Sequence, residues 1–201
     1  MGEVTDAWRR IEGWMARYAP DSAAVLAPPA REEDVRTAEE ATGLEFPPEL
    51  VESLLCHDGL LKWANIFPGK PPLPVAKIVA HWEMCCAEME EDDEFLDEDE
   101  EPWWHPLWLP FAASDGDSQI IDLRPGPGYG RLGSAAHDDA GGFADAWPSL
   151  GAYLTETADA LETGGGVRVW HPHLIADREL WWTFAGETEL HGRPLRPVRP
   201  G

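Results

Sequence analysis

A strand–turn–strand signal in the middle of the chain constrains its fold more than any other feature. Two apolar runs, Leu107–Ala112 and Gln119–Leu123, flank the turn sequence SDGD at residues 114–117. This pattern is typical of a β-hairpin, because glycine readily adopts the positive φ that a tight turn requires. After a second glycine-rich turn, residues 131–136 are predicted to form a third strand. The chain is therefore expected to contain an antiparallel meander.

Helical patterns lie on both sides of this meander. The first places Trp8, Ile11 and Met15 on one helical face, and Gly43 and Gly164 are helix-ending signals further along the chain. The predicted helices span residues 5–18, 31–42, 48 up to Gly59, 75–89 and 149–162. Helices that precede and follow a meander favour an α+β fold, in which a central antiparallel sheet packs against helices.

The remaining segments carry weaker signals. Residues 62–67 are short, aromatic and bounded by Pro68-Gly69, which predicts a strand. Two edge strands are predicted at residues 167–170 and 180–184. We expect a single domain over residues 1–185. The arginine- and proline-rich tail, residues 186–201, is predicted to be flexible and disordered.

The charge balance limits the classes of partner. With 38 acidic and 15 basic residues, the chain has a net charge of −23. Such a chain repels nucleic acid and anionic membranes, so we expect neither as a partner. Its long-range partners are expected to be basic proteins or metal ions. The alternative is that the acidity serves only solubility. The sequence leaves the oligomeric state open.

Cysteine usage and hydropathy predict a soluble, cytoplasmic protein. The three cysteines, Cys56, Cys85 and Cys86, are an odd number with two adjacent, which does not form a disulfide framework. The first residues, MGEVTDAWRRIEGWM, contain no apolar run of the kind that a secretion signal needs. The chain also has no apolar stretch long enough to suggest a membrane span.

A dense acidic segment, Glu88–Glu101, is the sharpest local feature, and two adjacent tryptophans follow it. Clustered carboxylates can steer a basic protein over long distances, and tryptophan is enriched in binding hot spots. The predicted partner-binding residues are Glu90, Glu91, Asp92, Asp93, Glu94, Asp97, Glu98, Asp99, Trp103 and Trp104. The alternative is a solvated loop whose tryptophans anchor it in the core.

Catalytic and metal-binding patterns are weak. Cys56 and His57 are neighbours on a predicted helix, so their side chains point about 100° apart and do not form a nucleophile–base pair. His171 and His173 flank a proline, and the chain contains neither an HExxH motif nor a CxxC pair. The glycines of GPGYGRLG at residues 126–133 favour a hairpin turn over a phosphate-binding loop. We therefore expect no enzyme activity, no metal and no cofactor.

Three segments, taken in order, resemble the SMI1/KNR4 (SUKH) family. They are FPPELVESLLCHDGL, IFPGKPPLPVAKIVAHW and WLPFAASDGDSQIIDLRPG. The helical segments WRRIEGWM and WPSLGAYLTETADAL are similar in place and character. The resemblance implies a compact α+β fold with helices around an antiparallel sheet.

The resemblance also implies a protein-binding role without a catalytic residue. Many bacterial members of this family are immunity proteins that neutralise toxins by direct binding, while fungal members regulate cell-wall synthesis through protein contacts. By this resemblance, we expect an immunity protein that occludes a cognate toxin, with a basic toxin domain as its partner. The alternative is a regulatory or scaffolding protein without a toxin partner.

Overall fold

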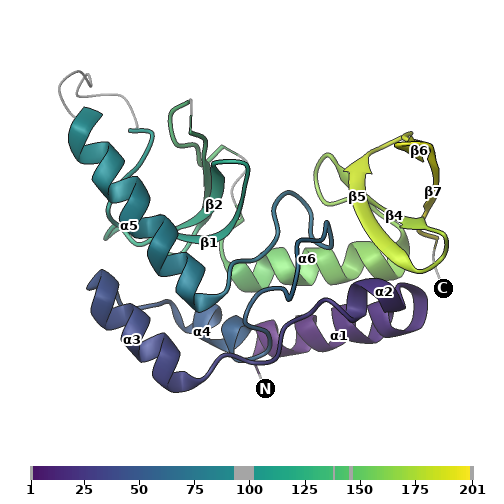
Figure 1. Ribbon diagram of the computed structural model, residues 1–201, viewed down its shortest axis with the longest axis horizontal. Helices are drawn as coiled ribbons and strands as arrows, with labels where there is room; N and C mark the ends of the chain where they lie inside the picture. The colour runs from purple at the N-terminus through teal and green to yellow at the C-terminus, as the bar shows by residue number, and fades with distance from the viewer. Residues whose placement is uncertain (1, 93–101, 138, 145–146, 200–201) are drawn as a thin grey trace.

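The computed structural model describes residues 2–92, 102–137, 139–144 and 147–199 of the chain (Figure 1). The helices are α1 (Glu3–Tyr18), α2 (Pro20–Ala23), α3 (Glu32–Thr42), α4 (Pro48–Leu54), α5 (Val75–Asp92) and α6 (Leu150–Thr163). The strands are β1 (Trp108–Ser114), β2 (Asp117–Asp122), β3 (Leu132–Ala135), β4 (Trp170–Ile175), β5 (Glu179–Phe184), β6 (Glu189–Leu190) and β7 (Arg193–Pro197).

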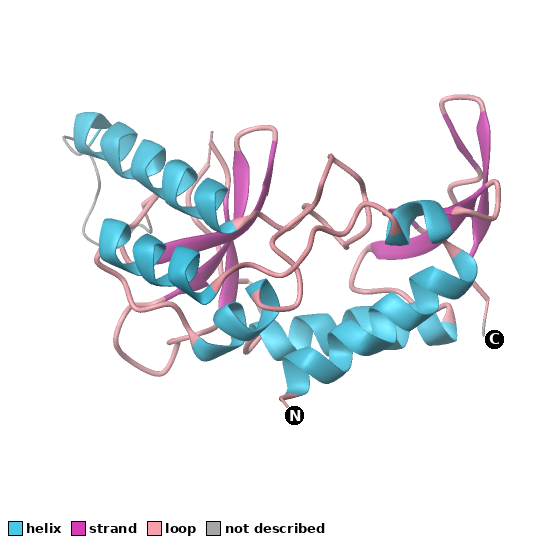
Figure 2. Cartoon of the chain, turned by 60° about the horizontal axis from the view of Figure 1, so that its bottom comes forward, coloured by secondary structure: helices cyan, strands magenta, loops and turns pink. Residues whose placement is uncertain are grey.

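These strands form two antiparallel sheets at opposite ends of the molecule. The first sheet has the order β1-β2-β3 and the second has the order β5-β4-β7-β6. Helices α1 and α6 lie side by side and run between the two ends (Figures 1 and 2). Helix α5 packs against β1, and α3 lies beside α5. The α+β prediction is confirmed, but the sheet structure is divided between two ends.

The residues at the β1–β2 turn and at the helix ends adopt the conformations that the sequence predicts. The β1–β2 hairpin turns at Asp115 and Gly116, which have φ values of 55° and 89°. Both are positive, as a tight two-residue turn requires. Helices α3 and α6 end at Gly43 and Gly164, each in the left-handed conformation. Ser149 caps α6 by accepting a hydrogen bond from the backbone N–H of Ala152.

The short helix α4 ties the two long helices together. Its Glu52 carboxylate accepts a hydrogen bond from the backbone N–H of Thr5 at 2.9 Å, in the first turn of α1. Its Glu49 carboxylate accepts one from the backbone N–H of Gly151 at 2.8 Å, in the first turn of α6. Helix N-termini have unpaired N–H groups and favour negative charge. The two glutamates of α4 therefore stabilise the N-termini of both α1 and α6.

Two hydrophobic clusters bury opposite faces of the first sheet. Leu109, Ile121 and Leu132 point into the main core, which α1 and α6 share. Trp108 and Ile120 point the other way, into a smaller cluster beneath α5. Apolar packing on both faces therefore stabilises the position of this sheet.

The second sheet packs one of its faces against the main core and is joined to the main body along an edge. Leu180 and Trp182 belong to the main core. The side-chain amide of Asn65 pairs with both the backbone N–H and the backbone C=O of Trp182, each at 3.1 Å. The Ser22 hydroxyl accepts a hydrogen bond from the N–H of Leu180 at 2.8 Å. These side chains cover the edge of β5, which would otherwise expose unpaired backbone groups.

Three sequence-based predictions differ from the structure. Residues 62–67 form no strand, because Asn65 reaches β5 with its side chain instead of its backbone. The strand predicted at residues 167–170 is only an isolated bridge, and β4 begins at Trp170. The tail predicted to be disordered contains β6 and β7. The proline-rich sequence of β7 is compatible with pairing, because non-proline residues donate N–H groups there: Leu195 donates to the Thr188 carbonyl, and Val198, just after β7, donates to the Pro172 carbonyl.

Candidate protein-binding surface

The structure describes only part of the predicted acidic site. Glu90, Glu91 and Asp92 form the end of α5. The other predicted acidic contacts lie outside the described residues; they are Asp93, Glu94, Asp97, Glu98 and Asp99. The chain re-enters the described part at Pro102, whose carbonyl accepts a hydrogen bond from the N–H of Gly141 at 2.9 Å. The predicted contact through these carboxylates stays a prediction.

The two tryptophans after the acidic segment belong to the smaller core. Trp104 has an exposed fraction of 0% and donates its indole N–H to the Cys86 sulfur at 3.4 Å. Trp103 is half-buried, with its ring centroid 6.3 Å from that of Trp104. Trp104 therefore presents no surface to a partner in this structure and anchors its segment beneath α5. Only Trp103 keeps part of its surface exposed.

Helix α5 carries a cysteine–histidine pair that the sequence patterns did not indicate. The Cys85 sulfur lies 3.7 Å from Nε2 of His81, and that nitrogen also lies 2.6 Å from the Ser118 hydroxyl. Burial raises the pKa of the Cys85 thiol to about 12 and lowers the pKa of His81. A nucleophilic cysteine needs a lowered thiol pKa. These groups therefore have the character of a packed core cluster.

The other candidate pairs are occupied in local contacts. Nε2 of His57 lies 2.6 Å from the Glu12 carboxylate and Nδ1 lies 2.6 Å from the Ala27 carbonyl. His137 donates to Asp117, and together with Lys70 it holds the pKa of that carboxyl at about 2. Within the described residues, no three His, Cys, Asp or Glu side chains are grouped as metal ligands. No described helix is long and apolar enough to cross a membrane.

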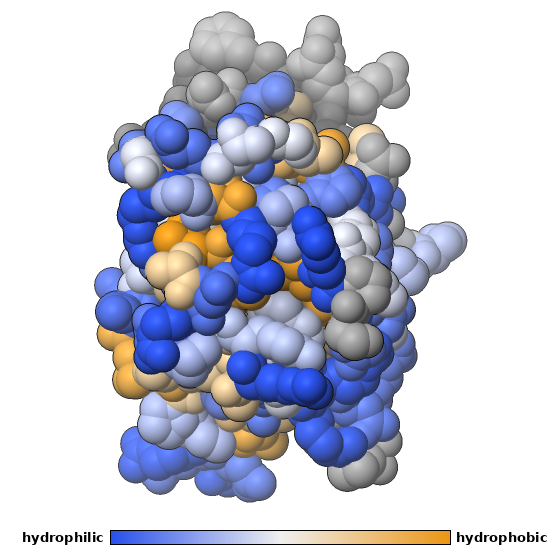
Figure 3. Space-filling view, turned by 90° about the vertical axis from the view of Figure 1, so that its right-hand side faces the viewer, coloured by the Kyte–Doolittle hydropathy of each residue, from blue (hydrophilic) through white to orange (hydrophobic). Residues whose placement is uncertain are grey.

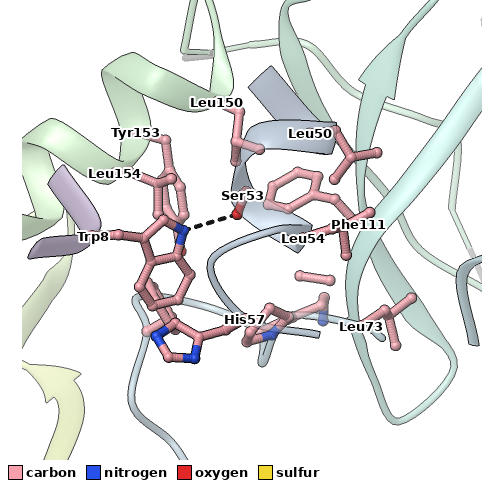
Figure 4. A pocket seen from close by; sticks show the side chains of 14 residues that line it. Trp8, Leu50, Ser53, Leu54, His57, Leu73, Phe111, Leu150, Tyr153 and Leu154 are labelled. Atoms are coloured by element: carbon pink, nitrogen blue, oxygen red, sulfur yellow. Dashed lines mark hydrogen bonds between the residues drawn. The ribbon is translucent and has the colours of Figure 1, made fainter. Parts of the chain in front are cut away.

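A crevice at the centre of the fold lies where α1, α4 and α6 meet (Figure 4). Its walls are mostly apolar, and its polar groups include Ser53, whose hydroxyl accepts a hydrogen bond from the Trp8 indole N–H at 2.9 Å. The space within it is about 20 Å³. That volume holds about one water molecule.

An exposed aromatic surface lies where the main body meets the second sheet. We call it the aromatic surface and define it as Leu61, Trp63 and Trp181. Leu61 is 67% exposed and Trp63 is 60% exposed. The Trp63 ring lies edge-on to that of Trp181, with 5.8 Å between the ring centroids. Large apolar side chains exposed together commonly mark an interaction site.

Rigid elements hold the aromatic surface in position. The N–H of Leu61 donates to the Val25 carbonyl at 2.9 Å. Two residues after Trp63, the Asn65 amide binds the backbone of β5, and the Trp182 indole N–H donates to the Ile66 carbonyl at 3.1 Å. The loop and the strand that carry the two tryptophans are thus bonded to each other. A partner would bind this surface without first ordering it.

Charged side chains border the aromatic surface. Arg178 precedes β5 and pairs with Asp21 of α2 at 2.7 Å. The hydrogen bond from Arg178 lowers the pKa of the Asp21 carboxyl, and Lys62 lowers it further. The end of the molecule formed by the second sheet carries many hydrophilic side chains, with apolar patches between them (Figure 3). The aromatic surface therefore combines an apolar centre with a charged rim, as protein interfaces do.

Comparison with known protein families identifies the family of this chain. The model of the SMI1 / KNR4 family (SUKH-1) matches residues 29–156. The chain belongs to this family. The match runs from just before α3 into α6 and contains the whole first sheet. The second sheet lies outside the match, so the aromatic surface combines a family loop with a strand beyond it.

Fungal relatives give the same assignment. The "Cell wall assembly regulator SMI1" of Saccharomyces cerevisiae is 24% identical over 248 aligned positions, which cover 100% of this chain and 47% of the yeast protein. A "KNR4/SMI1 homolog" of Kluyveromyces lactis is 37% identical over 59 residues, 29% of this chain and 11% of that protein. The chain thus spans less than half the length of these relatives.

Sequence reasoning missed the aromatic surface for a physical reason. Tryptophan is apolar enough for a core and common enough at interfaces for either place. One signal was present in the WW pair of β5. Because successive strand residues point to opposite faces, only one of Trp181 and Trp182 can face the core. Trp182 is 1% exposed, and Trp181 lies on the other face.

Proposed function

We propose that this chain is a non-catalytic protein-binding domain whose aromatic surface contacts the partner. The observation that carries the proposal is the exposure of Leu61 and Trp63 at 67% and 60%, beside Trp181. Burying exposed tryptophan at an interface releases much more free energy than burying most other side chains, and tryptophans are enriched among residues that dominate affinity. The hydrogen bonds between the Asn65 loop and β5 support this role, since they fix the surface before binding.

Two roles are compatible with protein binding. A regulatory or scaffolding role is supported by the similarity to the yeast cell wall assembly regulator, which extends over the whole of this chain. An immunity role, in which the chain occludes a bacterial toxin, is supported by the net charge of −23, because a basic toxin domain would be drawn to it. We place the regulatory role first, because its support comes from a specific relative.

The acidic segment has a different proposed role from the aromatic surface. Carboxylates from Glu90 to Asp99 would increase the rate of encounter with a basic partner, while the aromatic surface would slow dissociation. The two contributions respond differently to salt. Added salt screens the carboxylates and slows association, but it leaves burial of the tryptophans largely unchanged.

The test compares partner capture by the full chain with capture by two variants. Trp63→Ser combined with Trp181→Ser removes the aromatic surface, and Tyr129→Ser removes another exposed aromatic side chain, 53% exposed, as a matched control. We expect the double variant to lose the captured partner and the control to retain it. Equal capture by both variants would exclude the aromatic surface as the contact.

A second experiment separates the two roles. If a toxin gene adjoins the gene for this chain, its toxin domain is co-expressed with the wild-type chain and with the double variant. Rescue of growth by the wild-type chain alone supports the immunity role. Persistent toxicity with both chains supports the regulatory role. Association rates measured across a salt series then test the acidic segment, since a rate that does not change with salt excludes steering.

A further inference from the structure

A groove along α1 carries arginines in a chain that is otherwise strongly acidic. It encloses about 410 Å³ and is lined by one face of α1 together with Glu162 at the end of α6. The lining residues of α1 are Arg9, Arg10, Gly13, Trp14, Arg17 and Tyr18. The two helices lie side by side in Figures 1 and 2. This groove is formed by different elements from those that carry the aromatic surface.

The three arginines differ in how they are held. Arg10 is fixed across the helix pair, with Nε bonded to the Glu162 carboxylate at 3.0 Å and Nη2 bonded to Asp159. Arg9 pairs with Asp6 at 2.9 Å, and both side chains are about half exposed. Water screens such a pair strongly, so an incoming carboxylate can compete with Asp6 for the Arg9 guanidinium.

Arg17 is the arginine that an acidic ligand can use most directly. It is exposed, and its guanidinium lies 4.9 Å from the centroid of the Tyr18 ring. Among the described residues, no carboxylate lies within ion-pair distance of it. The ring contact orients the guanidinium while leaving its N–H donors directed at solvent.

Gly13 opens the groove between Arg9 and Arg17. It is exposed in the middle of α1, and a Cβ placed there would meet no atom within 4 Å. Glycine at such a position destabilises a helix relative to alanine, and neither packing nor a positive φ requires it here. Trp14, only 8% exposed, forms the floor beside it, with its ring 5.3 Å from that of Tyr18.

We propose that this groove binds an extended acidic segment of a partner protein, in which two carboxylates flank one apolar side chain. Arg9 and Arg17 are eight residues apart on a helix, which places their backbones about 12 Å apart. In an extended peptide, residues i and i+4 lie on one face about 13 Å apart, with residue i+2 between them. Carboxylates at i and i+4 would meet the two arginines, and the side chain at i+2 would enter the space above Gly13.

The same distances argue against other anions. The backbones of the two arginines lie about 12 Å apart, a span that matches two separate carboxylates better than a single phosphate group. A long nucleic acid would meet the repulsion of the net charge of −23, whereas a short peptide presents only two charges. The groove thus favours a protein segment with the pattern acidic–x–apolar–x–acidic.

The test measures binding of a fluorescein-labelled peptide containing Glu-Ser-Leu-Ser-Glu to the full chain by fluorescence anisotropy. The matched peptides replace both glutamates by glutamine or place them side by side. We expect the first peptide to bind the most tightly. Arg17→Gln should weaken its binding about fivefold, and Gly13→Leu should weaken it about tenfold or more by filling the hollow.

Arg36→Gln on α3 is the control for the change in net charge, since Arg36 is also an exposed helical arginine. It should leave the affinity unchanged, and circular dichroism should show that all variants keep their helices. Equal binding of the rearranged peptide, displacement of the peptide by inorganic phosphate alone, or an equal effect of Arg36→Gln would each overturn the proposal.

Discussion

The two sheets of this protein differ in what covers their faces. The first sheet is covered on both faces, with Leu109 and Ile121 in the main core and Trp108 and Ile120 beneath α5. The second sheet packs one face against the main core through Leu180 and Trp182. Its other face buries His173 and Ile175 on β4 and carries Trp181 on the edge strand β5. The first sheet lies inside the family match and the second lies outside it. This difference suggests that the first sheet maintains the fold, while the second extends it and contributes to the proposed binding surface.

The largest expected difference is in the free energy of unfolding of two tryptophan variants. Trp104→Ala removes a ring that is 0% exposed, so it should reduce the free energy of unfolding by about 3–5 kcal/mol. Trp63→Ala, at a site 60% exposed, should change it by no more than about 0.5 kcal/mol. Urea unfolding of both variants measures the difference. Similar losses would mean that the aromatic surface is part of the core.

A smaller effect should loosen the second sheet alone. Asn65→Ala removes both hydrogen bonds to the Trp182 backbone, at a cost of about 1–3 kcal/mol. Amide hydrogen exchange should become faster in β5 and stay unchanged in β2. Asn65→Asp, which keeps an acceptor for the Trp182 N–H but loses the donor, should have an intermediate effect. Faster exchange in both sheets would show that they do not differ in this way.

The smallest expected effect concerns the hairpin of the first sheet at low pH. The hydrogen bond from His137, with that from Lys70, lowers the pKa of Asp117 from 3.8 to about 2. A lowered folded-state pKa contributes stability above pH 3.8 that is lost as the pH falls toward about 2. Because Asp117 is 35% exposed, this contribution should stay within about 1 kcal/mol. In acid unfolding experiments, Asp117→Asn should lose this pH-dependent contribution to stability. Asp115→Asn should unfold with the same pH dependence as the wild type.

Much of the first sheet and its helices could be predicted from local chemistry. The SDGD turn, Ser149 and the helix-ending glycines each determine the conformation of their own neighbourhood. The second sheet was harder to predict because its pairing is not local. The tail strand β7 pairs with β4 about twenty residues away, and its prolines argued for disorder when read alone.

The binding surface was less predictable than the fold. A sequence does not report which tryptophan is buried, since Trp63 and Trp104 each precede apolar residues within a few positions. The charge of the acidic segment favoured a partner contact through the adjacent tryptophans, but Trp104 belongs to the core. Exposure of Trp63 arises from the long-range contact between Asn65 and β5, which no local pattern contains.

Amide hydrogen exchange of the chain, alone and in complex with the partner that it captures, tests the proposed contact most directly. We predict that binding slows exchange in residues 60–65 and in β5, and that the β1–β2 hairpin exchanges at the same rate in both states. Protection confined to other segments, with residues 60–65 and β5 unchanged, would contradict the proposal that the aromatic surface binds the partner.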